Sequence, residues 1–427
     1  MQSETAFDFM NSLLAASALL LVLPHSATGQ AVAPWLFPNF SDRLEVQVSN
    51  PSAQSVHTVV VVSAKDLARI APGFPGSMAV AIVRSPLAVL SSQADDLDGN
   101  GQPDEFVIDV RASPHATLPI DVYYSKTLHE SIPEPKQVSA SHSFGYNHAT
   151  AALESEMIGY RTYGGFFLDV QARAKEHPGL MNELVGYMSA SAGSHSAVGR
   201  DVLHIGDTLG LGGLFTTQNG AVFRPPVNVP DYVHKPPQGD TPTYRVIASG
   251  PVRATIEARM EHWHMGSDVV SIVETYSITA GNEAVRCDFK IEPISLAHSY
   301  QVGAGIRELP ALHRDNGTGR LSLEGQQSAS IGVIGMALYF NPSAASAFDS
   351  LVTPDGANEA IVFHSQLAPG HAVEGTFWVA AAWSGSGTGQ PVEHLRSIEQ
   401  EARTSLAVTA ITHSVNPTPQ RLEGEAY

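Results

Sequence analysis

The chain of 427 residues is poor in cysteine and in positive charge, and both deficits exclude classes of protein. The single thiol, Cys287, excludes a disulfide framework and any metal site built from several cysteines. With 24 Lys and Arg against 42 Asp and Glu, the formal net charge is −18, so the basic footprint of a general nucleic-acid binder is missing. Charged residues make up only 15%, whereas hydrophobic residues make up 43%, which excludes a disordered tail and a coiled coil.

Few segments have a helical pattern. The 36 Gly and 28 Pro are also too many for a helical bundle, so that class of protein is excluded. Strand signals dominate instead. Residues 43–49 alternate between apolar and polar side chains, and residues 56–63 form a β-branched run. Further short strands are expected at 78–84, 105–111 and 118–124, each bounded by Pro, Gly or Ser. This spacing predicts a small β-sandwich near the N-terminus.

The N-terminal segment has the features of a secretory signal peptide. The apolar run 13–23 is too short to span a bilayer comfortably, and Pro24 and the small residues 27–29 follow it. Glu4 and Asp8 stand where a basic region is usual, and a start at Met10 would remove both. We therefore expect residues 1–29 to be cleaved, and the mature protein to be periplasmic or secreted, with no membrane segment.

A polar segment with two prolines, residues 126–141, marks a domain boundary. We predict a signal peptide at 1–29, an N-terminal sandwich at 30–128 and a large sandwich at 140–427. The expected fold class is all-β, with a small N-terminal β-sandwich, a larger mutarotase-like sandwich and few helices. Later strands are expected at 152–161, 165–172, 253–262, 268–278, 284–291, 330–340, 359–365 and 375–383, a helix at 392–404, and long loops at 193–213 and 223–242.

Residues 95–105 (DDLDGNGQPDE) have the order of a calcium-binding loop. Oxygen-bearing side chains recur at alternate positions, and Gly101 stands at the sixth position, where a sharp turn is needed. All ligands are hard oxygens, which favours Ca²⁺. The twelfth position, Val107, departs from the pattern, and a solvated hairpin turn is the alternative. The predicted ligands of a structural Ca²⁺ are Asp96, Asp98, Asn100, Gln102 and Asp104, and we expect no organic cofactor.

Six motifs stand in order along the chain: NP at 50–51, SQADDLDGNGQPDEF around Asp98, ALESEMIGYRTY at 152–163, GRDVLHIGDTLGLGGL at 199–214, GPVRATIEARMEHW at 250–263 and YSITAGNEAVRCDF at 276–289. As an ordered set they resemble the family catalogued as domain of unknown function 4861. That resemblance implies secreted bacterial β-sandwich proteins that are encoded among genes for degrading uronate-rich polysaccharides such as pectin and ulvan. A similar-looking protein is an oligosaccharide dehydratase, and the second half resembles the galactose-mutarotase-type sandwich, whose concave sheet binds sugars.

Elimination from a uronate needs a base for the C5 proton, a cation or donors for the carboxylate, and an acid for the leaving oxygen. Arg161 and Tyr163 share one face of the expected strand 152–161 and its extension, so Arg161 can clamp a carboxylate and Tyr163 can transfer a proton. Glu154, Glu156 and Tyr160 are expected on the other face. The alternative is a structural Arg–Glu pair with a tyrosine lid.

A second group of candidates ends the strand 253–262. His262 and His264 share a face and are candidates for proton transfer, and Trp263, opposite them, is a candidate for stacking on a pyranose. Surface histidines at a strand end are the alternative interpretation. Arg253, at the start of the same strand, is a candidate for substrate binding.

Three further candidates lie on expected loops. Asp201 and His204 introduce a glycine-rich stretch, where glycine lets the backbone approach a ligand, and we assign them to substrate binding. The stretch lacks the Lys-Ser/Thr ending of a phosphate loop. His148 is a candidate base, with a simple turn residue as the alternative.

Three functions remain open from the sequence. The first is a lyase or dehydratase that acts on uronate-containing oligo- or polysaccharides by β-elimination. The second is a noncatalytic carbohydrate-binding accessory protein, and the third is a mutarotase or epimerase that uses His264 with Glu257.

Overall fold

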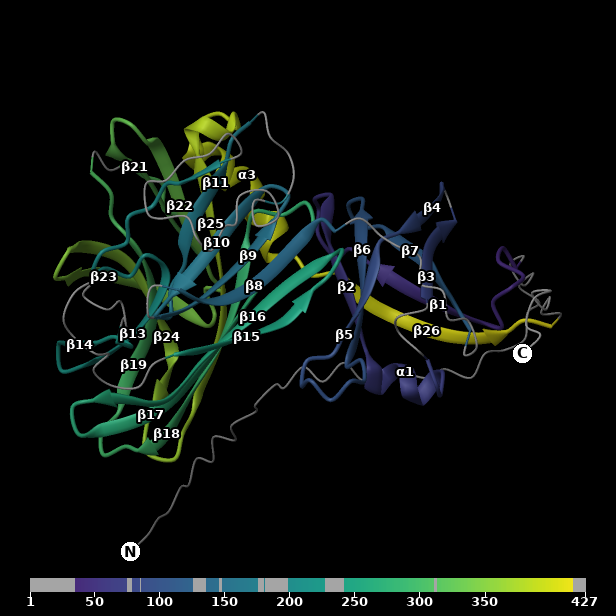
Figure 1. Cartoon of the computed structure of the whole chain (residues 1–427), viewed down its shortest axis with the longest axis horizontal. Coiled ribbons are helices and arrows are strands. Elements are labelled where there is room, and N and C mark those ends of the chain that lie inside the picture. The colour runs from purple at the N-terminus through teal and green to yellow at the C-terminus, as the bar shows by residue number, and fades with distance from the viewer. Residues whose placement is uncertain are drawn as a thin grey trace, which may run out of the picture.

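The expected strands pair into antiparallel sheets in the computed structural model, which forms two β-sandwiches side by side (Figure 1). The structure describes residues 35–74, 79–84, 86–125, 136–145, 148–175, 180, 199–226, 242–310 and 313–417. The predicted signal peptide, 1–29, lies outside these residues. No helix among them is long and apolar enough to cross a membrane. The predicted all-β class, with a small sandwich before a large one, is confirmed.

The N-terminal sandwich encloses its own core because its strands alternate apolar and polar residues. Leu44, Val46 and Val48 of one sheet pack against Val60 and Val62 of the other. The short helix α1 (Ala64–Ile70) begins where the Ser63 hydroxyl accepts the amide hydrogen of Asp66. One sheet has the order β26 (Ala407–Val415), β1 (Asp42–Ser49), β7 (Thr117–Tyr124), β3 (Ala79–Arg84) and β4 (Leu87–Leu90), and the other β2 (Val56–Ser63), β6 (Glu105–Ala112) and β5 (Ser92–Asp95).

The C-terminal strand β26 corrects the predicted domain boundary. It pairs with β1 from Ala407 to Val415, so the end of the chain returns to the N-terminal sandwich (Figure 1). The predicted large sandwich at 140–427 had included this segment. A strand pattern reports only that a strand forms, whereas its partner here is more than 350 residues away.

The large sandwich has two layers. One layer is an eight-stranded sheet, and the other consists of two five-stranded sheets joined by a bridge between Leu168 and Leu211. The eight-stranded sheet has the order β15 (Thr243–Ser249), β16 (Arg253–Met265), β17 (Asp268–Thr279), β18 (Val285–Ser295), β25 (Val373–Trp383), β22 (Gly332–Tyr339), β21 (Arg320–Ser328) and β20 (His313–Arg314). The five-stranded sheets are β12 (Gly199–Asp201), β11 (Asp169–Arg173), β10 (Ile158–Tyr163), β9 (His148–Ser155) and β8 (Val138–Gly145), and β14 (Ala221–Phe223), β13 (Leu211–Gln218), β19 (Tyr300–Arg307), β24 (Gly356–Leu367) and β23 (Ala345–Thr353).

The main hydrophobic core lies between these two layers. Ile256, Ile272 and Phe377 of the eight-stranded sheet pack with Leu153 and Tyr160 of the other layer. The Tyr160 hydroxyl donates to the carbonyl of Glu283 and accepts from the amide of Ala381, so its polar end is satisfied inside the core. Because successive side chains of a strand point to opposite faces, the residues between these core residues lie on the outer faces of the two layers.

Helix α3 (Pro391–Arg403) covers part of the outer face of the eight-stranded sheet, after the short 3₁₀ turn η2 (Ser384–Ser386). Leu395 is fully buried against Ala337 and Ala380. The predicted helix at 392–404 is confirmed within one residue at each end. In Figure 1, α3 lies in the upper part of the large sandwich, beside β22 and β25.

The predicted strand 152–161 is wrong, because the structure places a hairpin there. Strands β9 and β10 pair antiparallel, with Glu154 opposite Gly159 and Ala152 opposite Arg161. The turn at Ser155, Glu156 and Met157 contains neither Gly nor Pro, so the sequence carries no strong turn signal. As a result Glu154 lies on the same face of the sheet as Arg161, and not on the opposite one.

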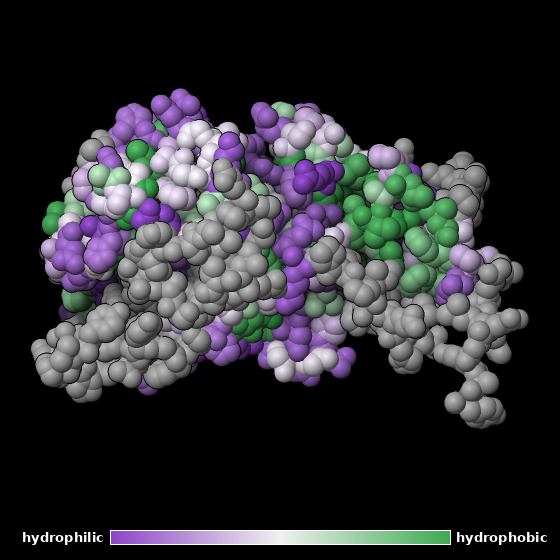
Figure 2. Space-filling view, turned by 45° about the horizontal axis from the view of Figure 1, so that its top comes forward, coloured by the Kyte–Doolittle hydropathy of each residue, from purple (hydrophilic) through white to green (hydrophobic). Residues whose placement is uncertain are grey.

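The exposed surface differs between the two sandwiches. Figure 2 shows hydrophobic surface gathered on the N-terminal sandwich and hydrophilic surface along the boundary with the large one. Leu87 and Val89 of the edge strand β4 are 65% and 62% exposed.

A carboxyl group stands inside the apolar core of the large sandwich. Glu274 of β17 is fully buried, and its Oε2 atom accepts a hydrogen bond of 2.6 Å from the Tyr276 hydroxyl. Its Oε1 atom has no partner among the described residues. Burial raises the pKa of Glu274 from 4.5 to about 8, since ionisation would leave a charge in an apolar environment.

Replacing Glu274 by Gln should therefore change how stability depends on pH. Between the pKa of 4.5 in the unfolded chain and about 8 in the fold, the folded state binds more protons, so the free energy of unfolding falls as pH rises. Glu274→Gln removes this loss, and its stability relative to wild type should increase from about pH 5 to about pH 8. Urea midpoints measure the effect, with the exposed Glu292→Gln as control. Parallel pH profiles for wild type and Glu274→Gln would contradict the burial of a protonated carboxyl.

Candidate functional site

The outer face of the sheet β8–β12 is polar, although it is buried. We call it the polar face, and the strand registers set its members side by side in three successive rows. On the inner side of the same strands, Leu153, Tyr160 and Val170 belong to the core. The small residues Ala152 and Gly159 separate the larger polar side chains. The polar face consists of Ser139, Ser141, Glu154, Arg161, Asp169, Gln171, Arg173 and Asp201.

Arg161 binds two carboxylates at the centre of the polar face. Its Nη2 atom donates to Asp169 Oδ2 at 2.8 Å and to Asp201 Oδ2 at 3.0 Å. The three residues are 7%, 1% and 3% exposed, so the cluster is shielded from bulk water. The Val170 amide donates to the other oxygen of Asp169 at 2.8 Å. One guanidinium thus neutralises only one of two buried carboxylates.

This imbalance shifts both carboxyl groups toward the protonated form. Burial, and then the charge of Asp201, raise the pKa of Asp169 to about 7, against the opposing effect of Arg161. Burial likewise raises the pKa of Asp201. Near neutral pH such a pair can hold one proton and one negative charge, which is what general acid and base catalysis requires.

Arg173 is the second cation of the polar face. It is 6% exposed, and its Nη2 atom donates to the Ser155 carbonyl at 3.0 Å and lies 3.6 Å from Glu154 Oε2. Its Nε and Nη1 atoms have no acceptor among the residues that the structure describes. Burial lowers the pKa of Arg173. A buried guanidinium with N–H groups that lack acceptors is suited to a ligand carboxylate.

The structure brings together Arg161 and Asp201 from the predicted site, but gives Arg161 a different environment. It was predicted as a free carboxylate clamp, whereas two protein carboxylates already occupy it. His148 and Tyr163 lie in β9 and β10, where they pair with Gly145 and Thr150. Their side chains are outside what the structure describes, so their predicted proton transfer stays a prediction.

The predicted group on β16 does not join the polar face. His262 and His264 are exposed, and His264 points away from the core, on the opposite side of the sandwich from Arg161. The pairing with β17 shifts between Met260 and Trp263, a bulge that exposes Glu261 and His262 together. Trp263 is 1% exposed inside the main core, so the prediction that it stacks on a sugar is wrong.

Arg253 and His204, predicted to bind substrate, also lie outside the polar face. Arg253 Nε donates to Asp95 Oδ2 at 2.8 Å and its Nη2 to Glu105 Oε2 at 2.6 Å, so it joins the large sandwich to the N-terminal one. His204 is exposed, and its amide donates to Gln327. Glu257, expected to act with His264, accepts a hydrogen bond from Arg245 at 3.3 Å.

The sequence interpretation missed Asp169, Gln171 and Arg173. The signal was present, because residues 168–173 (LDVQAR) alternate Leu, Val and Ala with exactly these three polar residues. Such alternation predicts a strand with one polar face. In the structure both faces of this strand are buried, so its polar side chains need partners in the protein or in a ligand.

The acidic loop, residues 95–105, joins β5 to β6 and brings several carboxylates close together. Carboxylate oxygens of Asp96, Asp98 and Asp104 lie within 4.8 Å of one another. Gly101 has a φ of 85°, which favours glycine at this turn. Asp96 accepts the amides of Gly99 and Gly101, which lowers its pKa. Two oxygens on one Ca²⁺ shell can be up to about 5 Å apart, so the spacing fits.

Comparison with known proteins places the chain in a family. A family model described as domain of unknown function (DUF4861) matches residues 48–403. The chain belongs to the DUF4861 family. The resemblance inferred from the motifs is therefore confirmed, and the match extends from β1 to the last residue of α3.

Solved structures align with the DUF4861 chain at low sequence identity. An α-mannosidase from Enterococcus faecalis V583 aligns with 10% identity and a TM-score of 0.47, over 88% of this chain and 46% of that one. A glycosyl hydrolase family 38 protein from Enterococcus faecalis aligns with 10% identity and a TM-score of 0.49, over 89% and 48%. The DUF4861 chain spans about half the length of these structures. No curated protein matches it.

The carboxyl pair can be tested without a substrate. In protein labelled at aspartate carboxyl carbons, one resonance should titrate near pH 7 and be absent from Asp169→Asn. Arg161→Met removes the cation that favours ionisation, so the pKa of the pair should rise further. The exposed Asp98→Asn variant should keep the resonance. An Asp169 carboxyl that titrates below about pH 5 would show that the pair is solvated in solution.

Proposed function

We propose that this DUF4861 protein is a secreted carbohydrate-active enzyme that cleaves uronate-containing oligosaccharides by β-elimination at the polar face. The observation that supports this most directly is Arg161 held between Asp169 and Asp201 in a buried position. Enzymes shift the pKa of catalytic carboxyl groups toward neutrality by such burial and pairing. The proposal that the protein is secreted is supported by the apolar run and the small residues at 13–29.

Asp201, Asp169 and Arg161 each have one role in the proposed elimination. The ionised member of the pair, Asp201, takes the C5 proton of the uronate. The C5–H electrons form the C4–C5 double bond, and the C4–O4 bond breaks. Asp169, the protonated member, gives its proton to the leaving O4 oxygen. Arg161 stabilises the charge that remains on the pair throughout.

Arg173 replaces Arg161 as the group that binds the substrate carboxylate. Its Nε and Nη1 atoms lie on different edges of the guanidinium, and neither has an acceptor among the described residues. A substrate carboxylate would accept a charge-assisted hydrogen bond from one of these atoms, and the guanidinium would stabilise the enolate charge that the carboxylate acquires. The substrate therefore supplies an acceptor for N–H groups that Glu154 and the Ser155 carbonyl do not bind.

Activity is measured by ultraviolet absorbance of the unsaturated uronate, with oligosaccharides of pectin, ulvan and glucuronan as substrates. Asp169→Asn should lower kcat by about 10²–10⁴-fold, since it cannot donate the proton. Arg173→Met should raise KM as well as lower kcat, whereas Arg173→Lys should recover part of the loss. Glu261→Gln, exposed on β16, should match wild type.

Two results would reject this function. Wild-type protein that binds these oligosaccharides without forming any unsaturated product would be an accessory protein. A change in anomer equilibration alone would identify a mutarotase or epimerase.

We also propose that the acidic loop binds a structural Ca²⁺ through Asp96, Asp98, Asn100, Gln102 and Asp104. The support is the spacing of the carboxylates and the turn at Gly101. Arg245 Nη1 donates to the carbonyl of Leu97 at 3.0 Å, so the loop contacts the large sandwich. A bound ion would stiffen this contact and take no part in the chemistry.

Calcium should raise the melting temperature of wild-type protein, and EDTA should reverse the change, because an ion that binds only the folded state stabilises it. The difference between the calcium and EDTA values should shrink strongly in Asp98→Asn. Glu261→Gln should retain the full difference. Equal melting temperatures of wild type in the two buffers would exclude this site.

A further inference from the structure

A polar groove lies between the two sandwiches, well away from the polar face. It has a volume of about 650 Å³, within the range of small-molecule binding sites, which also occur preferentially between domains. Its floor is the outer face of β16, β17 and β18. Val61 and Leu97 of the N-terminal sandwich form one wall, and Thr404 and Leu406, which follow α3, form another.

The floor of the groove is a ladder of hydroxyl groups. Thr275, Ser277 and Thr279 alternate along β17 with residues of the core, and Thr255 lies beside them on β16. The Thr255 and Ser277 hydroxyls lie 2.9 Å apart. Each hydroxyl can donate and accept, which matches the hydroxyls of a sugar chain. The indole of Trp378 also lines the groove and is half-buried.

The charges of the groove compensate one another. Arg245 donates to Glu257 at 3.3 Å, and Arg286 donates to Asp288 at 2.7 and 2.9 Å. Arg253 is bound by carboxylates of the N-terminal sandwich. Every guanidinium in the lining thus has a carboxylate partner. The groove therefore favours an uncharged ligand over a uronate.

The groove also continues along the sheet. A second, shallower hollow of about 480 Å³ shares Thr275 and Asp288 with it and extends to Lys290 and Glu374. A ligand that filled both would be elongated along β17 and β18. This shape fits a chain of several sugar units better than a monosaccharide.

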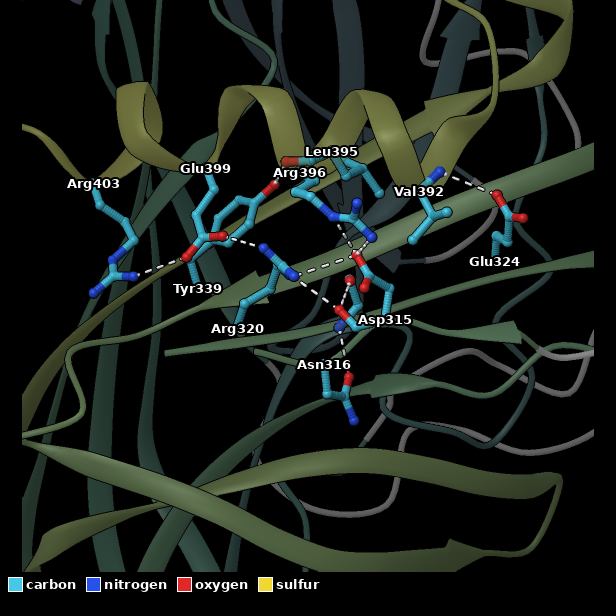
Figure 3. A network of polar contacts seen from close by, with 11 residues as sticks. Asp315, Asn316, Arg320, Glu324, Tyr339, Val392, Leu395, Arg396, Glu399 and Arg403 are labelled. Atoms are coloured by element: carbon cyan, nitrogen blue, oxygen red, sulfur yellow. Dashed lines mark hydrogen bonds and ion pairs between the residues drawn. The ribbon is translucent and has the colours of Figure 1, made fainter. Parts of the chain in front are cut away.

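The walls are held in place before any ligand binds. In Figure 3, Arg320 and Arg403 both reach Glu399, and Asp315 receives Arg396 and Arg320, so α3 is fixed to the large sheet. At the end of the same helix, Glu401 accepts the amide of His57 from the N-terminal sandwich at 2.9 Å. A rigid groove loses little entropy on binding, which favours affinity.

We propose that this interdomain groove binds an uncharged oligosaccharide chain, as a second site independent of the proposed elimination. The hydroxyl ladder hydrogen-bonds the sugar hydroxyls, and Trp378 packs against a pyranose face. Such a site would hold a neutral stretch of a polysaccharide and so keep the protein on its substrate.

The test is calorimetric titration with uncharged β-1,4-linked hexasaccharides of glucose, xylose and mannose. At least one should bind wild-type protein. The double variant Thr275→Val, Ser277→Ala removes two hydroxyls with little change of shape, and should bind that sugar at least about tenfold more weakly. Thr409→Val, on the exposed face of β26, is the matched control and should bind like wild type. Melting temperatures confirm that each variant is folded.

Binding that is unchanged in the double variant would overturn the proposal, as would no binding of any of the three sugars. Binding lost in Arg173→Met but kept in the double variant would place the sugar on the polar face and also overturn it. The probes carry no carboxylate, so they report nothing on elimination. Failure of the absorbance assay would therefore leave this result intact.

Discussion

A β-sheet has two faces, and the eight-stranded sheet of this protein must cover both. Its inner face is apolar along β16, β17 and β18, and the layer of two five-stranded sheets buries it. That second layer then presents its own far face, which carries Arg161, Asp169 and Asp201. On the outer side, α3 and the N-terminal sandwich cover the large sheet only in part, and the uncovered strip is the groove. Both candidate sites therefore lie on sheet faces that do not belong to the main hydrophobic core.

The two sites use the same residue types under different solvation. On the polar face two buried carboxylates share one guanidinium, so one of them retains a proton near neutral pH. In the groove Arg286 and Asp288 form a partly exposed pair, and solvent screens it. Burial raises the pKa of Asp169 in the first arrangement to about 7. The second remains a neutral surface that offers hydrogen bonds.

Much of the strand layout was predictable because alternation is a local property. The strands at 43–49, 56–63 and 268–278 agree with the structure within one residue at each end, and Arg253, Thr255 and Glu257 share the outer face of β16 as expected. Prediction failed where a turn lacked Gly or Pro, at 155–157, and where a bulge at Glu261 and His262 interrupted the alternation. The candidate site was predicted in part, through Arg161 and Asp201. Their partner Asp169 was missed although its alternating segment was visible.

The sequence by itself determined the all-β class, the inner and outer side of most strands, the oxygen-rich loop at 95–105 and the family. These depend on neighbours a few residues apart. Only the tertiary structure decided that Asp201 reaches Arg161 from 40 residues away, that Trp263 is buried in the core and that β26 closes the N-terminal sheet. Burial and charge pairing are properties of the surroundings, and the chain supplies those surroundings from segments that no local pattern connects.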